Sequence, residues 1–354
     1  MQGNSYAADV RSRAAVVLEE TTGRLLYAKN PNLRLQPAST TKLMTAIIVM
    51  ENAKLANVTT ISRNASLTSP TRSGFREGDK VTAETLLYAA LMRSANDAAV
   101  ALAEMVAGSE ERFVELMNRK AVSLGLRDTR FINSNGLPGP NQYITAYDLS
   151  MIMRHALRYP KLKEIIGTRM TEVSKENGGD VFLRNTNRLL WSDEELVGGK
   201  TGYTREARHC FVCAAERGDN MVVVALLGAP SRWSLWKETE SMIDRGFKIM
   251  ANSEEPVLYF AKADYDTAVV SHAVYKNSHG FGTAKNKSGV KKAKFRKKDS
   301  KNMLSAKLAK KAKSKKIVQM LSKKKCKTRL CAKVRNKGAR TYKIAGNCRY
   351  GTKG

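Results

Sequence analysis

Residues 37–46 read PASTTKLMTA and continue into IIVMENAKL, a run that is apolar at helical spacing. The proline and the small hydroxyl residues after it predict the start of a helix. Ser39 and Lys42 are then one turn apart on one helix face, so the lysine amine can reach the serine hydroxyl. A serine needs a nearby base to act as a nucleophile, and a buried lysine near another cation can be that base. The segment therefore predicts a nucleophile, Ser39, and its proton acceptor, Lys42.

The S-x-x-K pattern alone is weak evidence, because the chain repeats it at three other places. These are Ser234/Lys237, Ser288/Lys291 and Ser322/Lys325. A second motif, Ser94-Ala95-Asn96, lies at a polar break between two apolar helical stretches, where a bend can expose its side chains. S-x-N also recurs at residues 62–64, where a loop or a helix cap is the plainer interpretation. The occurrence of several motifs together, in a particular order, is therefore stronger evidence for a catalytic site than any single match.

A third motif, Lys200-Thr201-Gly202, occurs once, directly after two glycines and at the start of a strand-like run. Glycines at such a place let a backbone approach a ligand closely. A lysine cation and a hydroxyl at the edge of a sheet can hold a carboxylate. The motif thus favours an anion-binding strand edge, although a simple turn explains one K-T-G equally well.

The pattern of elements predicts a mixed α/β (α+β) domain. Apolar runs at 13–19 and 25–29, joined by the turn sequence TTGR, predict a β-hairpin. Helices are expected from residue 41, on both sides of the break within 82–106, and at 110–123, 146–158 and 234–250; three strands are expected between 196 and 229. Strands at both ends with helices between them predict a sheet assembled from both ends of this region.

The three motifs together form the set S-x-x-K, S-x-N and K-T-G. With the segments PASTTKLMTA, RSANDAAVALAE, NSNGLPGPNQYITAYDLS, NTNRLLW and GGKTGYTREA followed by VVVALLGAP, the chain resembles the serine D-alanyl-D-alanine carboxypeptidases, the low-molecular-mass penicillin-binding proteins. The resemblance covers about residues 11–250. It implies a β-lactamase/transpeptidase-like antiparallel sheet flanked by helices, in a catalytic domain at 8–252.

The resemblance implies a role for each motif residue. Ser39 is the acylated nucleophile and Lys42 its proton acceptor, while Ser94 and Asn96 complete the proton path and hold the substrate peptide bond. The substrate-binding residues are Lys200, Thr201, Gly202 and Tyr203. Of these, Lys200 and Thr201 hold the terminal D-alanine carboxylate, and the backbone N–H groups of Ser39 and Tyr203 form the oxyanion hole. β-Lactams mimic the dipeptide and should acylate Ser39.

Charge divides the chain into two parts. The formal net charge of +30 splits into +6 for residues 1–250 and +24 for residues 251–354. We expect a short β-like segment or linker at 253–275 and a lysine-rich basic tail at 276–354, mostly irregular, with an amphipathic helix at 303–321. The tail predicts contact with an anionic membrane surface or envelope polymer, with nucleic acid a weaker alternative and a solvated tail without a partner the plainest interpretation.

The sequence is ambiguous about the compartment. The start MQGNSYAADV lacks the apolar stretch of a signal peptide, yet Ser5 and Ala7 are the small residues that a cleavage site requires, which suggests a start downstream of a lost export signal. No uncharged apolar run approaches the roughly 20 residues that span a bilayer. The resemblance implies an extracytoplasmic location, in the periplasm or cell envelope.

The remaining polar residues predict little chemistry. The two cysteines of HCFVCAA, Cys210 and Cys213, should be core thiols that face opposite ways along a strand. Three others, Cys326, Cys331 and Cys348, leave their disulfide pairing open. The four histidines have no ligand spacing, so neither a metal nor a cofactor is expected, and Asp148 is expected to cap the helix that follows it.

The sequence therefore predicts a D,D-carboxypeptidase that removes the terminal D-alanine from peptidoglycan stem peptides. A D,D-endopeptidase acting on cross-links is a close alternative with the same site. A β-lactamase is a weaker one, because no E-x-x-L-N-type segment lies between the second and third motifs to supply a deacylating glutamate. An inert core with an anion-binding tail is the alternative from a different class.

Overall fold

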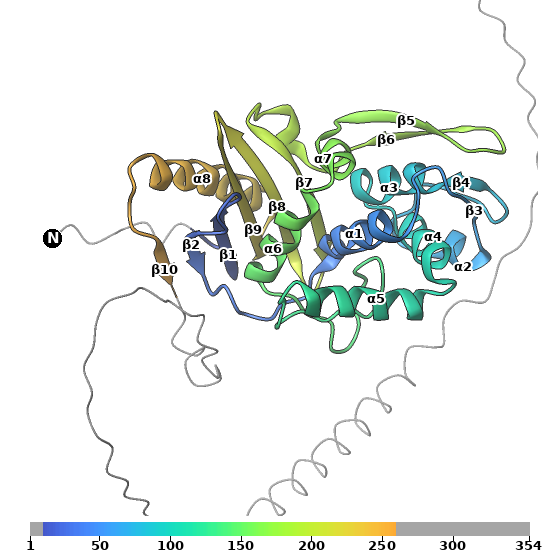
Figure 1. The fold of residues 1–354 in the computed structure, drawn as a ribbon, viewed down its shortest axis with the longest axis horizontal. Helices are drawn as coiled ribbons and strands as arrows, with labels where there is room; N and C mark the ends of the chain where they lie inside the picture. Colours follow the sequence, from blue (N-terminus) through green and yellow to red (C-terminus); the bar gives the residue numbers. More distant parts are fainter. Residues whose placement is uncertain (1–9, 260–354) are drawn as a thin grey trace, which may run out of the picture. The chain divides into compact units, whose positions relative to one another are not determined.

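A six-stranded sheet is the centre of the computed structural model, which describes residues 10–259 (Figure 1). The strand order is β10-β2-β1-β9-β8-β7. The strands are β1 (Ala14–Glu19), β2 (Leu25–Lys29), β7 (Leu196–Thr204), β8 (Arg208–Arg217), β9 (Asn220–Ala229) and β10 (Val257–Tyr259). All neighbours pair antiparallel except β10, which runs parallel to β2. The predicted antiparallel sheet is confirmed, with one parallel strand added at its edge.

The two ends of the described region meet at the centre of this sheet. Strand β1 pairs with β2 on one side and with β9 on the other, where Val17 lies opposite Val224. The β1–β2 hairpin turns at Gly23, whose φ of +74° is a conformation that glycine adopts at little cost. The prediction that the sheet combines strands from both ends is therefore confirmed.

Helices cover both faces of the sheet (Figure 1). They are α1 (Lys42–Asn52), α2 (Arg63–Leu67), α3 (Ala83–Met92), α4 (Asn96–Ala107), α5 (Glu110–Ser123), α6 (Ala146–Ala156), α7 (Pro160–Gly167) and α8 (Arg232–Ala251), with short 3-10 helices η2 (Ala38–Thr41) and η3 (Arg188–Trp191). Helix α8 packs on one face, against β1, β8 and β9, and α6 packs on the other. The remaining helices extend the second layer into a helical region.

Alternation along the strands gives each face its own core. In β1, Val16 and Leu18 belong to the core shared with the helical region, whereas Val17 packs beneath α8. The same alternation separates Cys210 from Cys213, which lie in the two different cores. Both are buried free thiols, and burial raises the pKa of the Cys210 thiol to about 12. The prediction of two core cysteines facing opposite ways is confirmed.

Several elements were not anticipated from the sequence. Two small two-stranded sheets stand beside the helical region: β3 (Val58–Thr60) pairs with β4 (Lys80–Thr82), and β5 (Met170–Ser174) forms a hairpin with β6 (Asp180–Arg184). Helices α2 and α7 were also missed. In α2 the serine of the second S-x-N pattern, Ser62, is the N-cap, since its hydroxyl accepts from the Ala65 amide. The cap interpretation of that pattern is correct.

The C-terminal predictions fall largely outside the described residues. Within 253–275, β10 supplies the one short strand that the structure describes. The rest of that segment, the tail 276–354 with its predicted helix 303–321, and the three tail cysteines lie outside residues 10–259. Among the described helices, none is long and apolar enough to span a membrane.

Candidate active site

The nucleophile candidate Ser39 lies on η2, the 3-10 turn directly before α1, and not on the first turn of α1 itself as predicted. Residues i and i+3 eclipse one another in a 3-10 helix, so the spacing still brings serine and lysine together. Lys42 Nζ is 3.0 Å from Ser39 Oγ. Ala38, just before the serine, has a φ of +48°, a strained conformation of the kind that clusters at functional sites.

Lys42 is fully buried and has three oxygen neighbours. Its Nζ lies 2.7 Å from Asn96 Oδ1 and 2.7 Å from the backbone oxygen of Asn135, in addition to Ser39 Oγ. Burial first, and then the charge of Lys200, hold the pKa of Lys42 well below its usual range, against an opposing effect of Asp97. A neutral amine has two N–H donors for the two amide oxygens and a lone pair for the Ser39 proton. The geometry therefore suits a base.

The second and third motifs meet through Lys200. This buried side chain, on β7, donates to Ser94 Oγ at 2.9 Å and to the backbone oxygen of Thr201 at 2.9 Å. Burial lowers the pKa of Lys200 to about 7. Ser94 adopts a φ of +64° in the bend between α3 and α4, which turns its hydroxyl toward β7. The bend expected at the polar break is thus the feature that joins the two motifs.

Thr201 has a partner that the sequence did not assign. Its Oγ1 lies 2.7 Å from Thr186 Oγ1, and the Thr186 amide donates to the backbone oxygen of Met92 at 3.0 Å. Thr186 belongs to NTNRLLW, a segment that carried the family resemblance without a residue role. It positions the Thr201 hydroxyl beside Lys200.

Gly202 lets β7 pass close to the nucleophile. A Cβ at this position would lie 3.0 Å from the Ser39 nitrogen and 3.2 Å from the Pro37 oxygen, closer than real Cβ atoms usually come. The absence of a side chain therefore brings the strand against η2. The next residue, Tyr203, is 59% exposed and its ring stacks on His209 at 4.5 Å between centroids. The backbone amides of Ser39 and Tyr203, expected to form the oxyanion hole, lie on the two sides of the close approach at Gly202.

A loop before α6 supplies the third wall around Lys42. Asn133 Oδ1 accepts from the Gly136 amide at 2.7 Å, which fixes the turn that presents the Asn135 carbonyl to the lysine. Gly136 has a φ of +83°, and a Cβ there would lie 1.8 Å from the Ala38 oxygen. The density of Gly, Pro and Asn in SNGLPGPNQYIT was the available signal, but it did not identify these residues.

Asp97 is a second residue that sequence reasoning missed. It is fully buried at the start of α4, and its carboxylate accepts from the backbone N–H groups of Ser73, Gly74 and Ala98. Burial raises the pKa of Asp97, although these hydrogen bonds oppose the effect. The carboxylate fixes the segment before α3 against the S-x-N motif.

Asp148 has a structural role other than the predicted one. Asp148 does not cap α6: Thr145 does, and Asp148 instead accepts from the Asp128 amide and the Thr129 hydroxyl. The shorter threonine reaches its own helix amides, whereas Asp148 lies one turn further on and faces the preceding loop. In residues 10–259, no group of three or more His, Cys, Asp or Glu side chains is placed to hold a metal.

Comparisons with known proteins identify the family of the chain. A family model described as Peptidase_S11, D-alanyl-D-alanine carboxypeptidase, matches residues 1–231. The chain is 33% identical over 286 residues to D-alanyl-D-alanine carboxypeptidase DacF of Bacillus subtilis, covering 79% of this chain and 69% of that protein. It is 34% identical over 234 residues to a D-alanyl-D-alanine endopeptidase of Pseudomonas aeruginosa, covering 64% and 74%. Two further carboxypeptidase relatives are spanned over only 62% and 63% of their lengths.

A solved structure shares the fold. The D-alanyl-D-alanine carboxypeptidase of Mycobacterium tuberculosis is 31% identical, with a TM-score of 0.65, over 68% of this chain and 92% of that one. The predicted arrangement of an antiparallel sheet flanked by helices is therefore confirmed by a known relative as well as by the topology.

Proposed function

Because the chain belongs to the D-alanyl-D-alanine carboxypeptidase family, we propose that it removes the terminal D-alanine from peptidoglycan stem peptides through an acyl-enzyme on Ser39. The family predicted from the three motifs is confirmed. The observation that carries the proposed reaction is the 3.0 Å contact between Lys42 Nζ and Ser39 Oγ in a site that lowers the amine pKa.

Substrate binding begins with the C-terminal carboxylate. Lys200, whose ammonium donates to the backbone oxygen of Thr201, and the Thr201 hydroxyl, which contacts Thr186, are neighbours on the edge strand β7 and together hold this anion. A bound carboxylate favours the charged form of Lys200, so it opposes the burial that lowers the pKa of the free site to about 7. Binding of the substrate carboxylate therefore keeps Lys200 protonated at neutral pH.

Acylation then uses Lys42 as the base. The amine takes the Ser39 proton while Oγ forms a bond to the carbonyl carbon of the penultimate D-alanine. The backbone N–H groups of Ser39 and Tyr203 receive the oxyanion, and Asn96 holds the substrate amide. The C–N bond breaks, and the leaving amine takes the proton back from Lys42, with the Ser94 hydroxyl as relay. D-alanine departs.

Deacylation repeats the chemistry with water. Lys42 takes a proton from the water as its oxygen attacks the ester carbon, and the Ser39–acyl bond breaks with return of the proton to Oγ. The product is a stem peptide shorter by one residue. A β-lactam should acylate the same serine, because its ring amide occupies the place of the D-alanyl–D-alanine bond.

One alternative keeps the same catalytic residues. A relative named as an endopeptidase matches the chain at an identity similar to that of the carboxypeptidases, which supports cleavage of cross-linked peptides as the second candidate. Carboxypeptidase action needs only a free D-alanine carboxylate at Lys200, whereas endopeptidase action needs room for a side chain beyond it. Carboxypeptidase activity therefore remains the first candidate and endopeptidase activity the second.

Mass spectrometry tests the function directly. After incubation with penicillin we expect a persistent covalent adduct on Ser39, absent in Ser39→Ala, and from a pentapeptide ending in D-Ala–D-Ala we expect free D-alanine. No adduct and no D-alanine would exclude the enzyme, leaving an inert core. Rapid turnover of the adduct would indicate a β-lactamase, and cleavage of a cross-linked dimer in preference to the pentapeptide would indicate an endopeptidase.

We further propose an extracytoplasmic location in the cell envelope, with the basic tail 276–354 bound to an anionic lipid surface. The supporting observation is the +24 charge of residues 251–354. Attraction of this kind is worth about 1 kcal/mol per basic residue near the surface and weakens with salt. Vesicles with anionic lipid should bind the full chain but not the variant that lacks residues 276–354. Salt-insensitive binding would contradict the electrostatic basis.

A further inference from the structure

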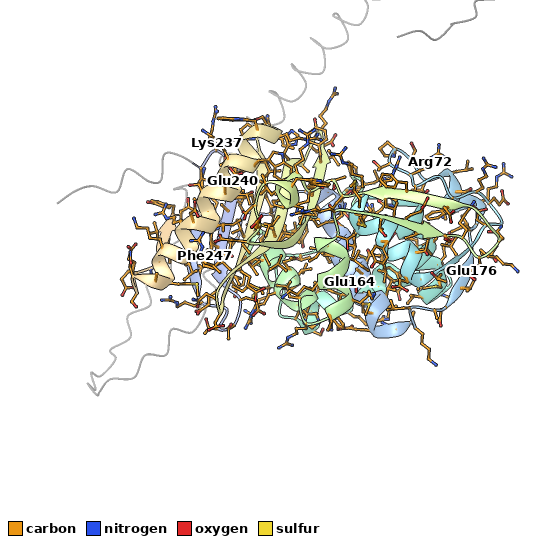
Figure 2. The ribbon with its side chains drawn as sticks, turned by 90° about the horizontal axis from the view of Figure 1, so that it is seen from above. Arg72, Glu164, Glu176, Lys237, Glu240 and Phe247 are labelled. Carbon is orange, nitrogen blue, oxygen red and sulfur yellow. The ribbon has the colours of Figure 1, made fainter. Side chains whose placement is uncertain are left out.

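Two surface pockets lie outside the catalytic contacts. The larger, about 620 Å³ beside α7, is lined by four acids, Glu164, Glu194, Glu195 and Glu216. Three of them have a basic partner: Glu164 has Lys161 at 2.8 Å, Glu195 has Arg217 at 2.6 Å and Glu216 has Lys163 at 3.4 Å. Most of its acidic charge is thus already compensated. Figure 2 shows Glu164 on the opposite side of the molecule from Arg72, which lines the second pocket.

The second pocket, of about 470 Å³, is rich in arginine. Arg72, Arg76 and Arg93 line it, and Glu77 is the one acid among its lining residues; we call it the arginine pocket. All three arginines are exposed. Within residues 10–259, no hydrogen bond or ion pair engages the Arg76 guanidinium, whereas Arg72 donates to the Ser66 oxygen at 3.0 Å and Arg93 to the Arg72 oxygen at 3.2 Å. The pocket therefore has an uncompensated cation.

The arginine pocket is attached to the catalytic motif. Arg93 directly precedes Ser94, and the Asn96 amide donates to the Thr71 oxygen at 2.7 Å. Asp97, the next residue, binds the amides of Ser73 and Gly74 through its carboxylate. The S-x-N motif thus forms one side of the active site and, through these contacts, holds the loop that lines the pocket.

The arginine side chains of the pocket favour one kind of ligand. Arginine guanidinium groups match a carboxylate in geometry as well as charge. The Arg76 guanidinium, which has no partner in the described part of the chain, is free to form both hydrogen bonds to such a group. The pocket therefore fits an anionic, planar acceptor.

From this arrangement we propose that the arginine pocket binds a free carboxylate of the stem peptide, upstream of the D-Ala–D-Ala bond, and so determines substrate specificity. The inference rests on the proposed function. The carboxylate belongs either to the side chain of the residue that precedes D-Ala–D-Ala or to the residue before that one. Substrates that carry this group are bound at two anionic points, the terminal carboxylate at Lys200 and the upstream carboxylate at Arg76.

Three model peptides ending in D-Ala–D-Ala test the inference. One carries a carboxylate on the residue that precedes D-Ala–D-Ala, one carries it on the residue before, and in the third both groups are amidated. We expect the wild-type enzyme to have a higher kcat/KM for one of the two acidic peptides than for the amidated one, through a lower KM. The preferred peptide identifies the source of the carboxylate, and added salt should reduce the preference.

Two variants connect the preference to the pocket. Arg76→Gln should reduce the ratio of kcat/KM between acidic and amidated peptides by roughly three- to tenfold, as expected for the loss of one hydrogen bond at an exposed site. Arg72→Gln should reduce it by a smaller factor, because the Arg72 guanidinium already donates to the Ser66 oxygen. Arg63→Gln is the matched control, because Arg63 is an exposed arginine of the same region that does not line the pocket.

The outcomes separate the two levels of the proposal. Equal kcat/KM for all three peptides, or an unchanged ratio in folded Arg76→Gln, would overturn the subsite while D-alanine release confirmed the function. Release of no D-alanine from any peptide by folded enzyme would overturn the proposed function, and the subsite with it. A thermal melt of each variant establishes that it is folded.

Discussion

The helical region and the sheet edge each contribute one buried lysine to the site, and the two lysines have different surroundings. Lys42, on α1, lies among three oxygen neighbours and near a second cation, which keeps its pKa well below the usual range. Lys200, on β7, has two partners and a pKa lowered to about 7 by burial alone. In the proposed reaction, one residue type thus serves as a base in one region and as an anion-binding cation in the other. The difference comes from neighbours and not from burial, which is complete for both.

The largest effect should come from removing the base. Lys42→Arg keeps a cation at the site, but a guanidinium stays protonated at any pH the protein tolerates. We expect acylation of Ser39 by penicillin to slow by about 10²–10⁴-fold, the usual contribution of a general base. Stopped-flow or mass-spectrometric acylation rates measure this. Lys54→Arg, an exposed lysine beyond α1, is the control and should react at the wild-type rate.

Substitution in the loop that presents the Asn135 carbonyl to Lys42 should have the next largest effect. Gly136→Ala places a Cβ 1.8 Å from the Ala38 oxygen at a φ of +83°, so the loop and the turn before Ser39 must separate. We expect a loss of about 2–4 kcal/mol in the free energy of unfolding and a slower acylation. Urea denaturation and penicillin labelling measure the two effects. Gly125→Ala shares a positive φ of +75° but meets no atom within 4 Å, so it isolates the backbone strain from the clash; equal losses in the two variants would contradict the packing argument.

Lys200, on the edge strand β7, should determine how kcat/KM changes with pH. A Lys200 pKa lowered to about 7 means that the free enzyme loses this cation as pH rises through 7. Consequently kcat/KM for the peptide should fall above pH 7, approaching about tenfold per pH unit, because this parameter reports the free enzyme. Lys200→Arg, if folded by its thermal melt, should move the fall to much higher pH. A wild-type profile that stays flat to pH 9 would show that Lys200 keeps its proton.

The smallest expected effect concerns the partner of Thr201. Thr186→Val removes the 2.7 Å contact between the two hydroxyls and leaves the shape of the side chain. We expect KM for the peptide to rise about two- to fivefold with kcat little changed, as for one neutral hydrogen bond. Thr22→Val is the control, because it loses the 3.1 Å bond from the Arg24 amide in the exposed β1–β2 turn. Equal kinetics for the two variants would remove Thr186 from the site.

Sequence predicted the parts of the molecule that have strong apolar periodicity. The hairpin β1–β2, the helices α1, α3 to α6 and α8, and strands β7 to β9 were all anticipated, since each buries a face or a stripe. The hairpin β5–β6 was missed because it is mostly exposed, with an alternating pattern that only partly faces the helices. Helix α7 was missed because eight residues carry little periodic signal.

The candidate site also has a part that the sequence predicts and a part that it does not. Side chains with a chemical signature were predicted, and the structure brings Ser39 to Lys42, Asn96 to Lys42 and Lys200 to Ser94. The Asn135 contact was not predictable, because its acceptor is a backbone oxygen that any residue type could offer. The need for glycine at 136 likewise depends on a neighbour nearly one hundred residues away along the chain.

The pairing of Val17 with Val224 also has a consequence for how the enzyme is made. Strand β1 is translated first but acquires its second neighbour only after β9 has been synthesised, about 200 residues later. Contacts of such long range are costly in loop closure and slow folding. The central sheet therefore forms late in the synthesis of the chain. Until then both edges of the N-terminal hairpin are unpaired, because β1 lacks β9 and β2 lacks β10. A chain that is interrupted before β9 has all three of its motifs in sequence and no finished sheet on which to assemble them.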